Sequence, residues 1–264
     1  MLPTDPAALP LLHDGRIEIA SRLVDASNAT LLCTVHCDGM SAECVYKPIR
    51  GERPLWDFPD GTLAGREVAS WLVSEATGWS LVPPTVLRAG PLGPGMVQLW
   101  VHTEQERDLV DVVALDAVPE GWRRVLRAHD RYGDPALLVH ADTEGLRRLA
   151  VLDVLLNNAD RKGGHVLAGL DGAVYGVDHG ICLHHEDKLR TVLWGFLGEL
   201  LPADVLAVLG RLRSDLDAAL GVALTEHLTR REVRALRARA DQLLTTGTFP
   251  APTGAWPAIP WPAF

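Results

Sequence analysis

One stretch of this 264-residue chain constrains its fold more than any other. An apolar helical pattern over 143–156 leads directly into a polar loop that holds Asp160 and His165, and a predicted hairpin over 166–177 then ends at Asp178. This order brings two carboxylates and an imidazole toward one point. One acid that orients an attacking hydroxyl, together with oxygen or nitrogen ligands for a divalent metal, is the equipment that phosphoryl transfer needs.

Composition excludes several classes of protein. With 47% apolar and 22% charged residues, the chain is typical of a globular protein, and it is long enough for two lobes. No apolar run approaches the roughly eighteen residues of a membrane span, and no signal peptide is visible, so we expect a cytoplasmic protein without a membrane span. The net charge of −9 argues against a nucleic-acid partner. The four cysteines show no CxxC spacing and are expected to be reduced thiols rather than zinc ligands.

The first part of the chain, 1–101, is predicted to form an N-terminal lobe made of a β-sheet and one helix. The helix is expected over 63–76, with Asp60 or Thr62 as its N-cap. Short β-rich runs predict the strands, which are 16–20, 31–35, 44–47, 85–88 and 96–101.

The second part, 102–245, reads as mostly helical and is predicted to form a C-terminal lobe. Asp142 is the expected cap of the helix over 143–156, and further helices are expected within 191–245. The stretch 246–264 is rich in proline and tryptophan and is expected to be an extended tail, either packed on the body or mobile. The fold class is therefore α+β with two lobes.

Lys47 and Glu67 precede the polar loop in the chain. Lys47 lies on a predicted strand, and Glu67 lies on the predicted helix, so an ion pair between them would hold the lysine over the α- and β-phosphates of a nucleotide. A lysine on a strand is weak evidence alone. The order lysine, glutamate, Asp160, Asp178 is that of kinase-like folds.

Two more groups are candidates for contacts with ATP. Ser27 and Asn28 occupy a predicted hairpin turn, where a hydroxyl and backbone amides can meet phosphate oxygens. Four residues at the end of the last predicted strand offer backbone groups to an adenine edge in a cleft between the lobes. These residues are Gln98, Leu99, Trp100 and Val101.

Three motifs, at 45–48, 158–161 and 177–180, resemble the phosphatidylinositol 3-/4-kinase-like branch of the protein kinase-like superfamily. The closest likeness is to a small actinobacterial family of that branch, and HipA-type bacterial kinases are more distantly similar. The resemblance implies a bilobal protein kinase-like fold with a β-rich N-lobe containing one helix and a mainly α-helical C-lobe. It further implies ATP in the cleft together with Mg²⁺ or Mn²⁺.

Carried over by position, the resemblance makes Lys47 the phosphate-binding lysine. Asp160 and Arg161 become the catalytic pair, and His165 and Asp178 become the metal ligands. His165 stands where many kinases have an asparagine, and the glycine-rich phosphate loop is absent.

The leading hypothesis is an ATP-dependent phosphotransferase that acts on a hydroxyl of a protein or small molecule. The histidine at position 165 and the absence of a glycine-rich loop leave a second hypothesis open, that the protein is a pseudokinase that binds nucleotide as a regulatory module. Transfer of AMP on the same fold is a third possibility.

Polar residues after Asp178 give weaker signals. His184, His185 and Glu186 are adjacent in sequence, and we expect their side chains to point apart, which disfavours a metal site. Lys188 and Arg190 either meet an anionic substrate or lie in a solvated loop.

Overall fold

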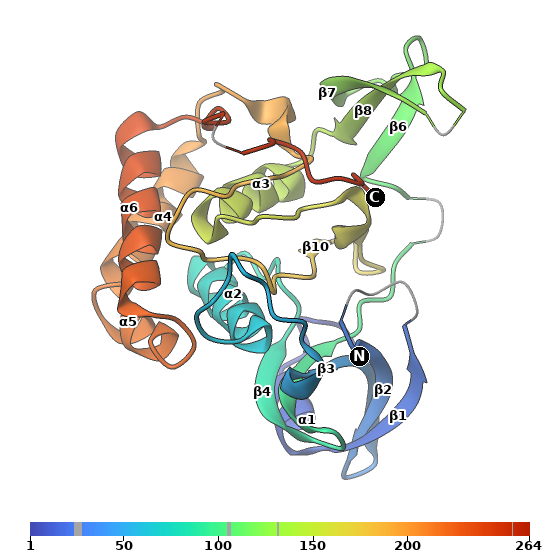
Figure 1. Ribbon diagram of the computed structural model, residues 1–264, viewed down its shortest axis with the longest axis vertical. Helices are drawn as coiled ribbons and strands as arrows, with labels where there is room; N and C mark the ends of the chain where they lie inside the picture. Colours follow the sequence, from blue (N-terminus) through green and yellow to red (C-terminus); the bar gives the residue numbers. More distant parts are fainter. Residues whose placement is uncertain (24–27, 105–106, 131, 255) are drawn as a thin grey trace.

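The computed structural model describes residues 1–23, 28–104, 107–130, 132–254 and 256–264. A β-rich lobe formed by the N-terminal part of the chain lies below a helical lobe in Figure 1, with helix α2 (Leu63–Thr77) between them. The predicted two-lobed α+β fold is confirmed. Within the described ranges, no helix is long and apolar enough to cross a membrane.

The N-lobe is a five-stranded antiparallel sheet in the order β1-β2-β3-β5-β4. Its strands are β1 (Arg16–Arg22), β2 (Leu31–Cys37), β3 (Met40–Pro48), β4 (Thr85–Gly90) and β5 (Gly93–Leu99). Helix α1 (Ala8–Asp14) was not predicted from the sequence, and it buries Leu11 and Leu12 against this sheet. A helix of two turns has too few residues for its period to stand out.

Helix α2 begins where the cap signals predicted. The side chain of Thr62, one of the two candidate caps, accepts a hydrogen bond from the amide of Gly65 at 2.9 Å. The helix ends at Gly78, which adopts the left-handed conformation that favours glycine at this position. These ends fix Glu67 on the second turn of α2, facing the sheet and the C-lobe.

A three-stranded sheet follows the N-lobe where a helical pattern was expected. It consists of β6 (Val110–Ala114), β7 (Trp122–His129) and β8 (Pro135–Ala141) in the order β6-β8-β7, and it projects from the body in Figure 1. The expectation of mostly helical structure directly after residue 102 is therefore wrong. The apolar run in β8 is short, and such a run fits a buried strand and a buried helix equally well.

The C-lobe is built around α3 (Glu144–Leu156), whose predicted leucine stripe is buried in the main core. Thr143 rather than Asp142 caps this helix, because Asp142 instead pairs with Arg123 and Arg147. The hairpin β9 (Val166–Ala168) and β10 (Val174–Gly176) follows as expected. The remaining elements are α4 (Ala203–Asp215), α5 (Ala219–Leu224), α6 (Arg230–Thr246) and the short 3₁₀ turns η1 (Ile49–Gly51), η2 (Gly163–His165) and η3 (Trp194–Phe196).

A buried ion pair ties the two lobes together. Arg66 on α2 lies 2.5 Å from the Glu232 carboxylate on α6, and both side chains are only 1% exposed. Arg66 also donates to the carbonyl oxygen of Cys182 at 2.9 Å. Glu232 is held from its other side, because it forms the capping box of α6 with Thr229.

Breaking this pair is expected to destabilise the protein strongly. The substitution Arg66→Met keeps an apolar stem but leaves the Glu232 carboxylate buried without a cation, so we expect the free energy of unfolding to fall by about 3–5 kcal/mol. Urea unfolding measures this loss. Arg107→Met is the matched control, because Arg107 pairs with Glu104 at a 48% exposed position and its loss is expected to cost about 0–1 kcal/mol. Equal losses in the two variants would contradict the prediction.

Candidate active site

A lysine and a glutamate from the N-lobe form the first part of the site. Lys47 on β3 places its Nζ 2.7 Å from Oε1 of Glu67, as the sequence predicted. The other carboxylate oxygen of Glu67 accepts a hydrogen bond from the amide of His179 at 2.8 Å. Burial raises the pKa of Glu67, and the ammonium of Lys47 opposes that rise. Glu67 therefore links the lysine of the N-lobe to the C-lobe segment that carries Asp178.

Asp178 is the second partner of the lysine. Its Oδ1 lies 2.8 Å from Nζ of Lys47, and its side chain is 51% exposed. Burial lowers the pKa of Lys47, but the carboxylates of Asp178 and Glu67 outweigh that effect and raise it above the ordinary value. The same lysine holds the pKa of Asp178 well below its usual range, so the carboxylate is ionised at neutral pH. Asp178 also has a φ of 60°, a strained angle for a residue other than glycine and one typical of functional sites.

His165 faces Asp178 from the turn η2. Its Nε2 lies 3.6 Å from Oδ2 of Asp178, and its Nδ1 lies 3.1 Å from the carbonyl oxygen of Asp160. An N–H at Nδ1 donates to that carbonyl, which leaves the lone pair on Nε2 directed at the carboxylate. Burial lowers the pKa of His165 to about 4, so the ring is neutral at pH 7. A neutral imidazole beside an ionised carboxylate fits a divalent cation.

Asp160 lies in the same loop, with its side chain 27% exposed. Its Oδ2 is 3.5 Å from Nζ of Lys162, and its backbone amide donates to the side chain of Asn158 at 2.9 Å. Burial raises the pKa of Asp160, while Lys162 and Arg190 lower it. The carboxylate is thus held by its loop and is partly exposed, as a proton acceptor requires.

Arg161 is fully buried beneath the loop of Asp160. Its side chain is 0% exposed, and its guanidinium bonds to Asp153 at 3.0 Å, to the carbonyl oxygen of Val177 at 2.8 Å and to His179 at 2.7 Å. The prediction that Arg161 is catalytic is therefore corrected, because a guanidinium enclosed in this way cannot touch a substrate. It positions the loop of Asp160 against the strand that leads to Asp178.

The candidates for phosphate contact can be placed only in part. Asn28 uses its side-chain oxygen to accept a hydrogen bond from the amide of Arg53 at 2.9 Å, beside the end of β3. Ser27 lies outside the described residues. The contact of this turn with a nucleotide stays a prediction.

Hydrogen bonds within the N-lobe reduce the number of residues at 98–101 that remain candidates for contact with adenine. Gln98 is buried, and its side chain donates to Thr85 at 2.8 Å. The amide of Leu99 donates to the carbonyl oxygen of Pro84 at 2.9 Å, and the amide of Trp100 donates to that of Glu43 at 3.0 Å. Gln98 and Leu99 lie in β5, which has a strand on each side, and Trp100 directly follows it, so each of these three residues has its amide or its side chain engaged in the N-lobe. Val101, which follows β5, is the remaining candidate of the four.

The residues after Asp178 differ from expectation. The rings of His184 and His185 stack at 4.2 Å, and their ligand atoms lie with that of Glu186 within 4.8 Å of one another, so the expectation that these side chains point apart is wrong. Nδ1 of His184 accepts a hydrogen bond from the amide of Glu186 at 3.0 Å. That bond occupies the lone pair a metal would need, and we assign no metal here.

The side chains of Lys188 and Arg190 both contact other groups of the protein, which differs from the expectation of a solvated loop or a substrate contact. Lys188 is buried, with its ammonium 3.5 Å from Asp57 and 4.2 Å from the ring centre of Trp256. Arg190 donates to the carbonyl oxygen of Ala159 at 2.6 Å and so lies against the loop of Asp160. These supporting roles were not predicted, and neither was that of Lys162, which pairs with Asp160 two positions before it.

The fold is that of the protein kinase-like class. The solved structure of the Golgi casein kinase with Mn/ADP bound is similar over 90% of this chain and 74% of that chain, with a TM-score of 0.55 at 15% sequence identity. A second structure of the Golgi casein kinase gives a TM-score of 0.54, also at 15% identity, over 90% of this chain and 72% of that chain. At this level of identity the likeness defines the fold and not the activity.

The chain itself belongs to the family of Protein Rv2133c from Mycobacterium tuberculosis (strain ATCC 25618 / H37Rv). The two sequences are 51% identical over 263 residues, which covers 96% of this chain and 94% of that protein. No family model matches the chain.

Proposed function

We propose that this protein is an ATP-dependent phosphotransferase that acts on a hydroxyl group of a protein or small molecule. One observation carries the proposal: Lys47 lies within 2.8 Å of both Glu67 and Asp178, while Asp178 also faces His165 at 3.6 Å. The likeness in fold to a kinase with Mn/ADP bound supports nucleotide and a divalent metal as ligands. The motif resemblance supports the phosphatidylinositol 3-/4-kinase-like branch as its place in the superfamily.

Each side chain then has a distinct role. Lys47, held by Glu67, binds the phosphates of ATP, and Val101 is the candidate for contact with the adenine. His165 and Asp178 hold Mg²⁺ or Mn²⁺, which neutralises charge on the phosphates when bound. Asp160 orients the acceptor hydroxyl and takes its proton as the oxygen bonds to the γ-phosphorus, while the bond to the bridging oxygen breaks and ADP leaves.

The test is direct. The purified protein is incubated with ATP and either Mn²⁺ or Mg²⁺, and ADP release and intact mass are measured. ADP release, with phosphate added to an acceptor or to the chain, supports the proposal. An added nucleotide mass would instead establish AMP transfer, and nucleotide binding without turnover on either metal would establish a pseudokinase.

His165 should set the metal preference. Imidazole nitrogen suits transition metals better than Mg²⁺, which prefers oxygen ligands, so we expect turnover to be faster with Mn²⁺ than with Mg²⁺. His165→Asn replaces the nitrogen by an amide oxygen, and the ratio of Mn²⁺ to Mg²⁺ activity should then fall about ten-fold, equivalent to roughly 1.4 kcal/mol. Titration of both metals in both proteins measures the ratio. An unchanged ratio would show that His165 does not coordinate the ion.

A further inference from the structure

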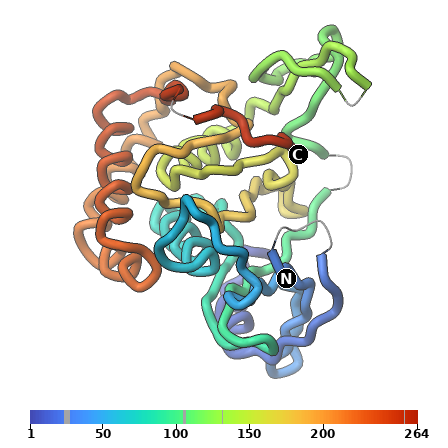
Figure 2. The backbone as a smooth tube through the Cα atoms, in the orientation of Figure 1, coloured from blue at the N-terminus to red at the C-terminus, as the bar shows by residue number. Residues whose placement is uncertain are grey.

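The end of the chain forms a strap, residues 256–264, that crosses the C-lobe and reaches the loop of Asp160. In Figures 1 and 2 the red end of the chain lies against the yellow loop that follows α3. The contact is a backbone hydrogen bond, in which the amide of Gly163 donates to the carbonyl oxygen of Ala263 at 2.8 Å. Gly163 lies between Asp160 and His165, the candidate proton acceptor and the candidate metal ligand.

The strap is also bound to the segment that follows Asp178. The carbonyl oxygen of Ala258 accepts hydrogen bonds from the amide of Thr191 at 3.1 Å and from the indole of Trp194 at 2.8 Å. The ring of Trp256 covers the ammonium of Lys188, as described above. The strap therefore contacts both the loop of Asp160 and the segment that pairs with that loop.

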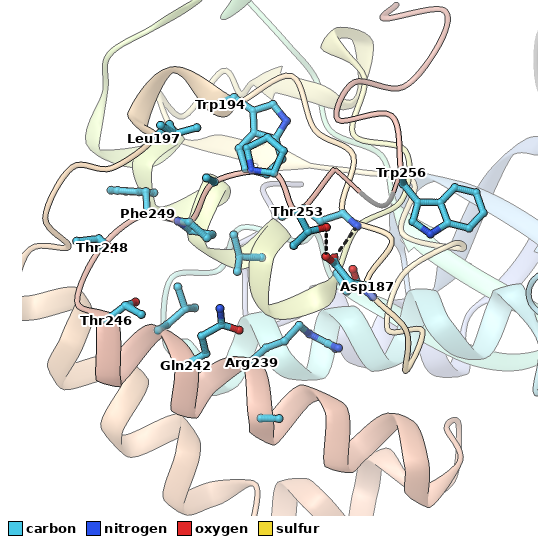
Figure 3. Close-up of a pocket in the computed structure, with 18 of the residues that line it drawn as sticks. Asp187, Trp194, Leu197, Arg239, Gln242, Thr246, Thr248, Phe249, Thr253 and Trp256 are labelled. Carbon is cyan, nitrogen blue, oxygen red and sulfur yellow. Dashed lines mark hydrogen bonds between the residues drawn. The ribbon is translucent and has the colours of Figure 1, made fainter.

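Phe249 is buried in the main core, and after it Ala251, Pro252 and Thr253 are exposed and line a cavity of about 690 Å³. Figure 3 shows this cavity, with Arg239 and Gln242 of α6 on one side and Thr253 and Trp256 on another. The chain is held over it by a hydrogen bond from the hydroxyl of Thr253 to Asp187 at 2.7 Å. Ile259 and Ala263 of the strap pack against the main core, so these apolar contacts and the hydrogen bonds of the strap fix its end.

A residue larger than glycine at position 163 would displace the ring of Phe264, which is 50% exposed. A Cβ atom built on Gly163 would overlap the ring of Phe264, whereas a Cβ built on Gly164 would meet open space. Gly163 is buried, and the structure gives it no left-handed backbone angle that would itself demand glycine. The close approach of Phe264 therefore favours glycine at this position.

We propose that Phe264 is a positioning residue, which fixes Gly163 and thereby the spacing of Asp160 and His165 across the reacting phosphate. This rests on the proposed phosphotransferase function. A catalytic group displaced by about 1 Å can cost up to roughly a hundred-fold in rate, so a single anchor within this loop has a large effect.

Phe264→Ala is expected to lower kcat about ten-fold and to change the KM for ATP by less than about two-fold, because the ring contacts Gly163 in the loop of Asp160. Trp261→Ala is the matched control, since the Trp261 side chain is an aromatic of the same strap and is 87% exposed. It should keep the kcat of the unchanged protein. A kcat of Phe264→Ala that equals or exceeds that of the unchanged protein would overturn the proposal, because a strap that blocks the site would give an increase.

A double-mutant cycle tests the contact itself. Gly163→Ala should lower kcat by displacing the ring, and Gly164→Ala should not. The variant with both Gly163→Ala and Phe264→Ala should be no slower than Phe264→Ala alone, because the ring that the new methyl group would meet is gone. Additive losses would overturn the proposal.

Failure of the proposed function can be told apart from failure of this inference. If the unchanged protein shows no turnover, the proposed function fails, and hydrogen exchange of the peptide that covers 158–165 decides the role of the strap. Phe264→Ala should then speed exchange at that peptide while Trp261→Ala does not. Unchanged exchange in Phe264→Ala would overturn the proposal.

Discussion

Replacing Asp160 by asparagine is expected to lower the rate of phosphoryl transfer by about 10²–10⁴-fold, the range that general base catalysis supplies. Asparagine has the same size and can still hydrogen-bond an acceptor hydroxyl, but it cannot take the proton. The pKa of Asp160 is raised by burial, which makes the native carboxylate a better proton acceptor than an exposed one. The measurement is the initial rate of ADP formation at saturating ATP and metal.

The same variant should bind nucleotide almost normally. Lys47, Asp178 and His165 do not depend on the carboxylate of Asp160, because His165 bonds to the backbone oxygen of that residue. The dissociation constant of the metal–ADP complex should therefore stay within about two-fold of the unchanged protein, a difference of roughly 0.4 kcal/mol. Asp204→Asn, at an exposed position on α4, is the control for loss of one charge. If Asp160→Asn kept more than half of the turnover, another group would have to be the proton acceptor.

Part of the candidate site could be predicted from the order of its residues along the chain and from the helices and strands that carry them. Lys47, Glu67 and Asp178 are brought together by elements whose caps and turns are readable, such as Thr62 at the start of α2. Arg161 could not be placed in this way. Its burial is compensated by Asp153 and His179, which belong to other elements, and a charged residue reads as exposed unless those partners are known.

In the fold, too, some elements could be predicted from local sequence patterns and others could not. The long amphipathic pattern of α3 predicts a buried helix correctly, because many turns repeat the same period. Helix α1 and the sheet of β6, β7 and β8 were missed, because each element is short and its apolar residues become buried only against distant parts of the chain. The strap contact at Gly163 is of this kind too, since no local pattern relates Gly163 to Phe264.

Replacing Lys47 by methionine should be almost as damaging as the loss of Asp160, and it should act on two properties at once. Removal of a cation that stabilises charge on the transferred group is expected to lower turnover by about 10²–10³-fold. The variant also leaves Glu67, which is 1% exposed, without its ion-pair partner. The free energy of unfolding should therefore fall by about 2–3 kcal/mol, the cost of a buried polar group left unpaired.

A second substitution separates these two effects. Glu67→Gln keeps the size of the side chain and an oxygen that can accept from the amide of His179, but it removes the buried charge. In the variant with both Lys47→Met and Glu67→Gln, stability should recover toward that of the unchanged protein, because no unpaired carboxylate remains at position 67. Turnover should not recover, because the phosphates still lack their cation. If activity returned together with stability, Lys47 would act only through the fold and not on the nucleotide.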